Sequence, residues 1–279
     1  MSLAAPPLIL PVGQVSSRGL AAVPVDPEQL EGLRVDEACV SVAEFATFAR
    51  ETGYVSVAER AGASAVFSGL LRPDLRRASP TVPGAPWWRL VEGADWAHPE
   101  GPGSDVAAGT HADAGRGDRA DHPVVHLAAE DAEAFAGWCG MRLPTEEEWE
   151  RAARGGLEGT RYPWGDELVP DGEHMANLWQ GSFPLRDTAE DGYRGTAPVR
   201  SFPPNDLGLY EVAGNVWEWC AADPATGARA VRGGSYLGRE DSETGCGIAA
   251  RATREAASTR GDTGMRLVTD GALPWTPAR

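Results

Sequence analysis

Three segments of the chain repeat apolar residues at helical spacing, and two of them follow a helix-start signal. The first runs over residues 41–53, where the capping box SVAE precedes the apolar face and a glycine ends it. The second covers residues 130–140, in which alanine, phenylalanine and cysteine fall on one face. The third covers residues 145–156, from the capping box TEEE to a Gly-Gly pair. The pattern therefore predicts three amphipathic helices.

The rest of the chain keeps no helical period for long. Short apolar pieces at residues 197–202, 207–212 and 230–231 alternate with Pro, Gly and Asn, which is typical of short strands joined by ordered loops. Residues 101–121 hold almost no bulky apolar side chain and are expected to form a flexible surface loop. Nothing resembles a linker between two independent cores, so residues 1–279 are predicted to form a single domain.

Composition indicates a loop-rich chain with a sizeable core. Hydrophobic residues make up 42% of the 279 positions, which is enough to build that core. The 34 Gly and 22 Pro indicate many turns, and the 10 Trp must pack inside or line a cleft. We therefore expect much irregular structure held in place by aromatic side chains.

Charge and hydropathy disfavour two classes of partner. A formal net charge of -16 disfavours a nucleic-acid partner. No segment approaches the ~20 apolar residues that cross a bilayer, so no membrane partner is expected. The N-terminal MSLAAPPLILPVG lacks a basic residue before its apolar run and is broken by prolines, unlike a signal peptide. We therefore predict a cytoplasmic protein whose acidic surface serves solubility, as in a salty or high-GC actinobacterial cytoplasm.

The four cysteines show no metal-binding or redox motif. Cys39, Cys139, Cys220 and Cys246 lie far apart without CxxC spacing, and a reducing compartment leaves them as thiols. All four are interpreted as small buried or partly buried hydrophobes. Cys246 alone stays a site candidate, because it follows a Gly-Gly-Ser-Tyr turn and a Gly-containing acidic segment.

A set of motifs in one order connects the chain to a known family. The motifs are HPVVH (122–126), RLPTEEEWERAARGG (142–156), YPWGDE (162–167), ANLWQGSFP (176–184), EDGYRGTAPV (190–199), FPPNDLGLYEVAGNVWEWC (202–220), VRGGSY (231–236) and GMRLV (264–268). Their order closely resembles the formylglycine-generating enzyme, or sulfatase-modifying factor, family over nearly the whole chain. The resemblance implies an irregular α/β (α+β) fold, similar to C-type lectins, with little regular secondary structure.

The resemblance also implies two structural calcium ions, whose ligands carry over residue by residue. The first ion would be held by the side chains of Asn177 and Asp191 and by the backbone carbonyls of Leu178 and Tyr193. Oxygen donors on a rigid loop suit a hard cation such as calcium. The alternative is that these polar groups only cap turns.

The second implied calcium site falls in the motif EVAGNVWE. Its carried-over residues are Glu211, Gly214, Val216 and Glu218, and Glu211 stands where the family usually has asparagine. The substitution keeps an oxygen donor and adds a negative charge. At this site the sequence supports calcium binding and turn capping equally.

The resemblance fails at the catalytic centre of the family. Its members oxidise a cysteine of a target sulfatase to formylglycine with molecular oxygen, using two cysteines that bind copper. The aligned positions here hold Gly238 and Glu243, and copper(I) prefers soft thiolate donors, which neither residue supplies. Nearby, Ser242 replaces a tyrosine and Asp262 replaces an asparagine of the family. Copper is therefore not expected, and the glycine is expected to open space in the groove.

The remaining candidate site residues come from two sources. They are residues that match the family around its substrate groove, and residues of the changed segment: Trp217, Ser235, Arg251, Arg266, Glu243 and Cys246. The acidic run at residues 238–243 is interpreted as a solvated loop rather than a redox-metal site. A three-histidine iron site, as in the sulfoxide synthases of the superfamily, is not supported, because His122 and His126 bracket an extended Pro-Val-Val.

Two functions stay open, and the sequence favours the first. The first is an enzyme of this fold that acts on a different substrate, because the groove frame is kept while the reaction-specific residues have changed. The second is a non-catalytic binding or regulatory module, a pseudoenzyme, whose groove holds a peptide or a small molecule. Oxidation of sulfatase cysteines to formylglycine ranks last, because the thiol pair is missing.

Overall fold

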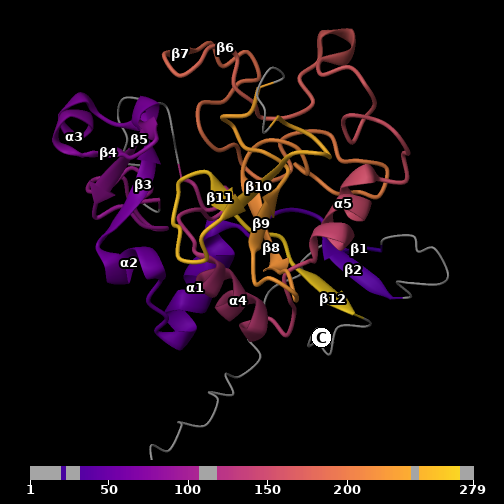
Figure 1. Ribbon diagram of the computed structural model, residues 1–279, viewed down its shortest axis with the longest axis horizontal. Coiled ribbons are helices and arrows are strands. Elements are labelled where there is room, and N and C mark those ends of the chain that lie inside the picture. Colours follow the sequence, from indigo (N-terminus) through magenta and orange to yellow (C-terminus); the bar gives the residue numbers. More distant parts are fainter. Residues whose placement is uncertain (1–19, 23–31, 107–117, 240–244, 271–279) are drawn as a thin grey trace, which may run out of the picture.

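The structure is a computed structural model that describes residues 20–22, 32–106, 118–239 and 245–270. Its regular elements are short, and long loops connect them (Figure 1). The helices of these ranges are α1 (Val42–Thr52), α2 (Val57–Ala61), α3 (Pro73–Ala78), α4 (Ala129–Trp138) and α5 (Glu146–Arg154), with 3-10 turns at Ser68–Leu70 and Pro170–Gly172. Within the described ranges, none of these helices has the length and hydrophobicity needed to span a bilayer.

The strands of the described residues form four small sheets. The central sheet has the order β10 (Arg251–Arg254), β9 (Arg229–Arg232), β8 (Trp217–Ala222), β11 (Thr263–Gly264), and its β8–β11 pair is parallel. A second sheet has the order β1 (Leu20–Ala22), β2 (Leu33–Asp36), β12 (Val268–Asp270). A third has the order β3 (Ala63–Phe67), β5 (Ala85–Glu92), β4 (Thr81–Val82), and the fourth pairs β6 (Gly181–Ser182) with β7 (Arg186–Asp187).

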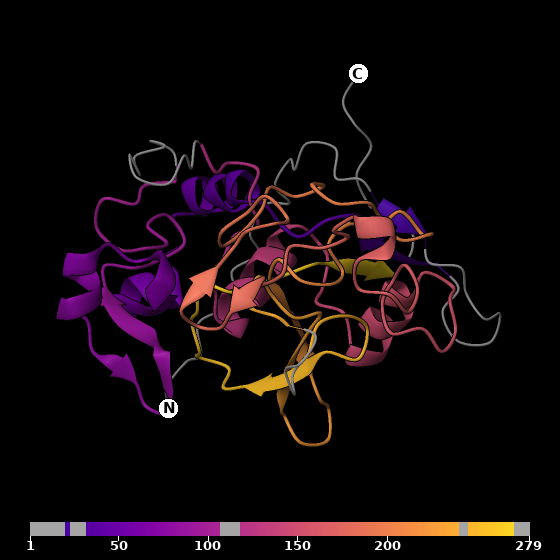
Figure 2. The same cartoon turned by 90° about the horizontal axis from the view of Figure 1, so that it is seen from above.

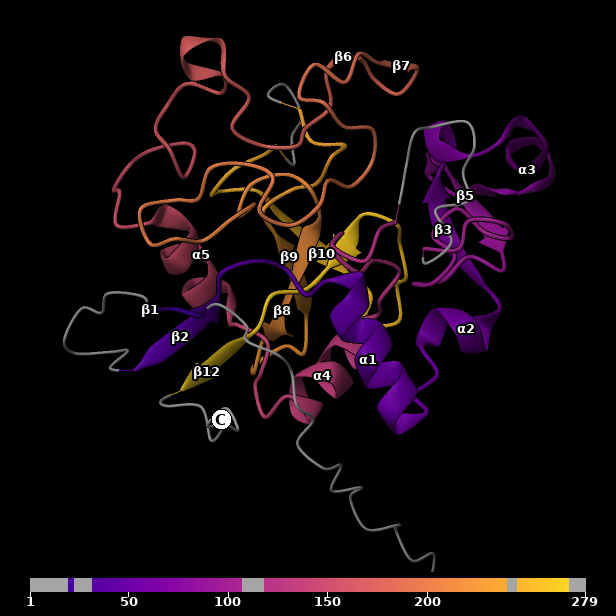
Figure 3. The same ribbon diagram turned by 180° about the vertical axis from the view of Figure 1, so that it is seen from behind.

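The central sheet lies at the middle of the molecule. Helices α1 and α4 lie side by side at one end of it, and α5 packs against β8 and β9 (Figures 1 and 3). The long loops between α5 and β8 gather at the end opposite to α1 and α4 (Figure 1). The β3–β5–β4 sheet forms one flank together with α2 and α3, and Figure 2 shows this flank in purple. The β3–β5–β4 sheet therefore lies beside the central sheet.

All three predicted helices are confirmed, and the two predicted capping boxes form as the sequence indicates. At α1 the Glu44 amide donates to the Ser41 hydroxyl over 3.4 Å, and the Ser41 amide donates to the Glu44 carboxylate over 2.8 Å. Gly53 ends the helix with a φ of 69°, a left-handed conformation that glycine adopts without a Cβ clash. Helix α5 repeats this arrangement between Thr145 and Gly155.

An aromatic core joins α1 and α4 to the central sheet. Phe45 and Phe48 of α1 pack against Phe135 and Trp138 of α4, with ring centroids 5.5 to 5.8 Å apart. Trp219 of β8 belongs to the same buried cluster. Each such ring pair contributes roughly 0.5–1.5 kcal/mol beyond its buried area. The cluster therefore fixes β8 in position, although the elements around it are short.

One of the three predicted strand segments is confirmed and two are wrong. Residues 230–231 lie in β9, whereas residues 197–202 and 207–212 form turns, bends and irregular chain. Their amides find acceptors outside any ladder, and the Val199 amide, for example, donates to the Asp121 carbonyl over 2.8 Å. Because these backbone groups are satisfied one by one, no neighbouring strand is required.

The predicted surface loop at residues 101–121 is anchored at both of its described ends. Val106 in its first part is buried, and Arg119 in its last part forms a buried ion pair with Glu100 at 2.7 Å. Residues 107–117 lie outside the described ranges, so the loop prediction is untested there. The ends of this segment therefore belong to the packed structure, in spite of their small and polar composition.

Candidate functional site

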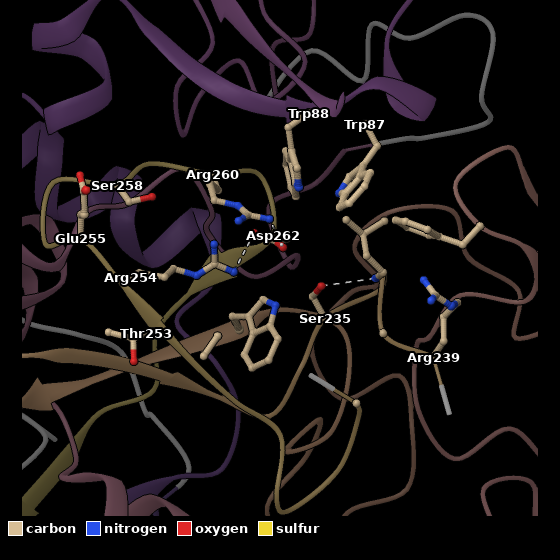
Figure 4. A pocket seen from close by; sticks show the side chains of 16 residues that line it. Trp87, Trp88, Ser235, Arg239, Thr253, Arg254, Glu255, Ser258, Arg260 and Asp262 are labelled. Carbon is tan, nitrogen blue, oxygen red and sulfur yellow. Dashed lines mark hydrogen bonds and ion pairs between the residues drawn. The ribbon is translucent and has the colours of Figure 1, made fainter. Parts of the chain in front are cut away.

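A groove of roughly 790 Å³ lies between the β3–β5–β4 sheet and the central sheet (Figure 4). Trp87 and Trp88 of β5 line one side of it. Trp217 of β8 and Arg254 of β10 line the other side, and the turn after β9 adds Ser235. Trp217 and Ser235 are thus part of the groove, while their roles stay predictions. The lining residues are distant in the sequence, so the groove exists only in the folded chain.

The β5 tryptophans are held in place by other aromatic rings. Trp88 meets Phe67 edge-to-face with centroids 6.2 Å apart, and Trp87 meets Phe183 in the same way at 5.5 Å. The Arg260 guanidinium lies 4.0 Å from the centroid of the Trp88 ring, a cation–π contact of roughly 0.5–2 kcal/mol. This side of the groove therefore offers flat apolar surfaces with a cation against them.

The Gly-Gly-Ser-Tyr turn leads into the floor of the groove, which we define as residues 235–238. The Leu237 amide donates to the buried Ser235 hydroxyl over 3.3 Å. The Gly238 amide donates to the Ser235 carbonyl over 2.7 Å. The Tyr236 hydroxyl donates to the Gly261 carbonyl over 3.2 Å. These bonds hold the floor in one conformation.

The space beside Gly238 in the floor is closed. A Cβ atom added at this glycine would lie 2.9 Å from the Ser235 carbonyl oxygen and 3.4 Å from the Cβ of Cys246. A backbone oxygen in a packed floor does not move aside without cost, so a larger residue requires the floor to shift. The expectation that this glycine opens space in the groove is therefore wrong.

The residues at the two aligned cysteine positions do not fit a copper(I) centre. Gly238 has no side chain, and Glu243, which lies outside the described residues, carries hard oxygen donors instead of a thiolate. Within the ranges that the structure describes, no group of three or more His, Cys, Asp or Glu side chains is arranged to hold a metal ion.

Two of the candidate arginines lie away from the groove, which corrects the sequence prediction. Arg251 is exposed on β10, and its guanidinium donates to the Glu146 carboxylate of α5 over 2.6 and 2.9 Å. Arg266 is buried and pairs with Glu218 at 2.8 Å. A matching motif position does not fix the direction of a long side chain, and each guanidinium here follows its carboxylate partner.

Cys246 lies beside the floor without lining the groove in the described part of the chain. It is half-buried and packs against the cluster of Ala176, Leu178 and Ala213. Its role stays a prediction. Of the other cysteines, Cys139 is also half-buried, and burial raises the thiol pKa of Cys39 and Cys220.

Sequence reasoning missed a charged cluster in the groove, made by Arg254, Arg260 and Asp262. The buried Asp262 carboxylate lies 3.5 Å from the Arg254 guanidinium and 3.2 Å from that of Arg260 (Figure 4). Burial alone would raise the pKa of Asp262, but the two guanidinium groups outweigh it and hold the pKa below its usual value. Burial lowers the pKa of Arg254 to about 10, which leaves it charged at neutral pH.

A signal for this cluster is present in the sequence. The segment RATREAASTRGD (251–262) places three arginines before an aspartate that stands where the family has asparagine. From the sequence, Asp262 is identifiable only as a departure from the family. Its two partners could not be chosen among the arginines of this segment without knowing how the loop folds.

The first predicted calcium site has an oxygen donor set that fits a hard cation. The Asn177 side-chain oxygen is buried and has no hydrogen-bond partner among the described residues. The Asp191 carboxylate accepts from the amides of Leu178 and Tyr193 over 2.9 and 3.0 Å. The Gln180 side-chain amide donates to both Asp191 and the Leu178 carbonyl. A buried oxygen that accepts no hydrogen bond has the capacity to bind a cation.

The second predicted calcium site does not fit a cation. The Glu218 carboxylate already accepts from Arg266 over 2.8 and 3.0 Å, from the Trp149 indole over 2.6 Å and from the Cys39 thiol over 3.1 Å. Arg266 thus supplies the positive charge that a metal ion would bring. Glu211 accepts two backbone amides over 2.9 and 3.2 Å. The ion pair and the further donors leave the Glu218 carboxylate little capacity for a metal, and Arg266 would repel a cation beside it.

Comparison with known sequences gives one consistent relationship. Residues 5–271 match the family described as "Sulfatase-modifying factor enzyme 1-like domain". The chain is 48% identical over 267 residues to the formylglycine-generating enzyme of Thermomonospora curvata, covering 88% of this chain and 85% of that protein. It is 45% identical over 202 residues to the inactive C-alpha-formylglycine-generating enzyme 2 of Mus musculus, covering 71% and 61%.

A solved structure shares the fold. PvdO from Pseudomonas aeruginosa superimposes with a TM-score of 0.54 at 18% sequence identity, over 90% of each chain. At this level of identity the similarity concerns the fold alone. Together with the short strands and long loops, it confirms the predicted irregular α/β (α+β) fold.

Proposed function

The chain belongs to the formylglycine-generating enzyme (sulfatase-modifying factor) family, and from this premise we propose that it binds a peptide or small molecule in its groove without copper-dependent oxidation. The sequence favours an enzyme with a different substrate. The groove instead supports the alternative, a binding or regulatory module of the same fold.

The observation that carries this proposal is the closed floor at Gly238. The first copper-binding cysteine of the family aligns with this glycine, and an added Cβ would meet the Ser235 carbonyl oxygen at 2.9 Å. A side chain at position 238 therefore requires the floor to shift, so the floor as it stands has no room for a thiol there.

The Ser235 hydroxyl has no base as a hydrogen-bond partner among the described residues. Its oxygen accepts from the Leu237 amide. No histidine lines the groove in the described ranges, and the lining carboxylates of Glu255 and Asp262 do not bond to this hydroxyl. Ser235 therefore lacks the activating partner that a serine nucleophile requires. The mouse relative named as inactive is consistent with a family that contains non-catalytic members.

Binding without conversion is the result that tests the proposal. A peptide with a CxPxR motif is incubated with the purified full-length chain, copper(I) and oxygen, and is analysed by mass spectrometry and titration calorimetry. We expect binding and an unchanged peptide. Conversion of the peptide cysteine to formylglycine would overturn the proposal, whereas failure of this peptide to bind would restrict the ligand to another chemical class.

Matched variants test the role of the floor. The double variant Gly238→Cys, Glu243→Cys is compared with Gly238→Ser, Glu243→Ser, which brings similar volume without thiols. Both are expected to unfold at a lower temperature than the wild type, because the floor must shift. Only the cysteine pair is expected to bind copper(I) in elemental analysis. Copper bound at one equivalent by the wild type would contradict the proposed loss of the centre.

A second candidate function rests on the position of Cys246. Its Cβ lies 3.4 Å from the Cβ that Gly238 lacks, so a thiol stands next to the position of the lost one. This favours an enzyme that uses Cys246 on another substrate. Turnover of a groove ligand that the variant Cys246→Ser loses would select this function over binding alone.

We also propose a structural calcium ion at Asn177 and Asp191. Oxygen ligands at this site would tie together the loops that carry them. Saturation at a hundredfold excess over Kd adds about 2.7 kcal/mol to the free energy of unfolding. We expect EGTA to lower the melting temperature of the wild type and of Asp187→Asn, a nearby carboxylate outside the proposed site. Asp191→Asn should not respond; an equal response of all three proteins would contradict the site.

A further inference from the structure

We infer that the groove contains an anion subsite formed by Arg254 and Arg260 around Asp262, so that its ligand carries a carboxylate, sulfonate or phosphate group. This inference rests on the proposed function, because it names the chemical class of the ligand that the groove binds. Neither arginine lies in the motifs that carry the resemblance to the family.

The first support is the charge balance of the cluster. Asp262 is ionised, because its pKa lies below the usual value, and both arginines are charged at neutral pH. Two guanidinium charges therefore face one carboxylate charge, and one positive charge is left over inside the groove. Glu255, the other acidic residue of the groove lining in the described ranges, is exposed. A leftover charge in a sheltered site favours an anionic partner.

The second support is an unmet hydrogen-bonding capacity. The side chain of Arg254 is only 7% exposed, and its contact with Asp262, at 3.5 Å, is longer than a good hydrogen bond. Its Nε has no hydrogen-bond partner among the described residues, and the same holds for Nε of Arg260. A buried N–H group without a hydrogen-bond acceptor is destabilising, so a bound oxyanion that accepted from these Nε atoms would relieve a cost already present in the free protein.

The third support is the direction of the two guanidinium groups. Arg254 lies over the Trp217 ring at 5.7 Å and Arg260 over the Trp88 ring at 4.0 Å. Figure 4 shows the two guanidinium groups close to each other, with Asp262 beside them and Trp88 above. The planar fork of arginine matches carboxylate, sulfonate and phosphate oxygens. The tryptophans beside it suit an apolar or aromatic portion next to the anion.

Small aromatic probes test this subsite with the full-length protein. Benzoate, benzenesulfonate and phenyl phosphate are titrated at low salt by calorimetry and ligand-observed NMR, and benzamide serves as the neutral analogue of benzoate. We expect at least one of the three anions to bind about tenfold or more tightly than benzamide, the size of a charge-assisted hydrogen bond. The order among the three anions separates a carboxylate ligand from a sulfonate or phosphate one.

Three variants assign the effect to the cluster. Arg254→Gln is expected to weaken anion binding about tenfold and to leave benzamide binding unchanged. Arg251→Gln, on the same strand but outside the groove, is the matched control and should not change either affinity. Asp262→Asn removes the competing carboxylate and should tighten anion binding, so a general loss of folding cannot imitate the expected pattern.

The outcomes separate this inference from the proposed function. Equal binding of benzoate and benzamide, unchanged by Arg254→Gln, would overturn the anion subsite and leave the proposed ligand-binding function standing. Absence of binding by all three anions would also overturn the subsite. Conversion of the CxPxR peptide would overturn the proposed function, while the probe titrations would still report on the subsite.

Discussion

Replacing the buried Glu218 by glutamine lowers the free energy of unfolding by about 3–5 kcal/mol, the loss typical of breaking a buried ion pair on one side. Glu218 and Arg266 have side chains only 1% and 2% exposed. The glutamine amide would place N–H groups against the guanidinium and the Trp149 indole, where oxygen atoms now accept. Arg266 would then keep its charge without a counter-ion.

Urea unfolding followed by tryptophan fluorescence measures this loss. Glu147→Gln is the matched control, because Glu147 pairs with Arg151 at 3.3 Å on the outside of α5 and should change stability by no more than about 0.5 kcal/mol. Glu218→Asp keeps the charge with a shorter reach and should fall between the two. A similar small effect for all three variants would show that the buried pair contributes little.

The Glu218→Gln substitution is also expected to weaken ligand binding in the groove. Glu218 and Trp217 are neighbours on β8 and point to opposite faces of the strand. The buried pair holds the inner face, and Trp217 lines the groove on the other face. A loosened inner face should therefore weaken ligand binding in the groove as well as stability.

Acidification is expected to destabilise the protein through His126 by about 3 kcal/mol between pH 7 and pH 4. His126 is fully buried, and burial lowers its pKa to about 4, although Glu100, the Pro99 carbonyl, Asp95 and Asp262 act against this shift. Its Nε2 donates to the Pro99 carbonyl over 2.9 Å, so Nδ1 accepts from the Ser64 hydroxyl at 2.7 Å. This arrangement requires the neutral ring.

The sign follows from the protons bound in each state. In the unfolded chain the pKa of His126 is about 6.5, so between pH 6.5 and 4 the unfolded state binds more protons than the folded one. The stability from the neutral ring is complete above about pH 6.5 and is lost as the pH falls towards 4. His126→Gln should flatten this part of the stability profile; parallel profiles of the two proteins would contradict the role of His126.

The sequence predicts local structure well where the signals are local. The capping boxes at Ser41 and Thr145 and the glycines at 53 and 155 act within one turn of chain, so the helices that they bound could be read from neighbouring residues. The segments 197–202 and 207–212 have strand-like composition, but their amides bond outside any strand pairing. The Val199 amide bonds to the Asp121 carbonyl, a partner that no local pattern contains. The amides of Leu207 and Leu209 bond instead to the nearby Asn205 side chain, which forms a turn and not a strand.

The candidate site was predictable only in part, for the same reason. Trp217 and Ser235 could be placed at the groove because they stand inside ordered motifs, and Gly238 because it follows the motif at 231–236. Arg251 and Arg266 also match family positions, yet they lie elsewhere because Glu146 and Glu218 bind them. An arginine side chain is long enough to reach either side of its strand, and the nearest carboxylate decides which.

The sequence by itself determined the family, the irregular fold, the three amphipathic helices and the absence of the thiol pair, because each of these depends on residue identity and short spacing. Only the tertiary structure decided that the floor at Gly238 is closed and that Arg254, Arg260 and Asp262 meet in one groove. Packing and charge pairing act between residues distant in the chain, so their outcome depends on distances that a linear pattern does not contain.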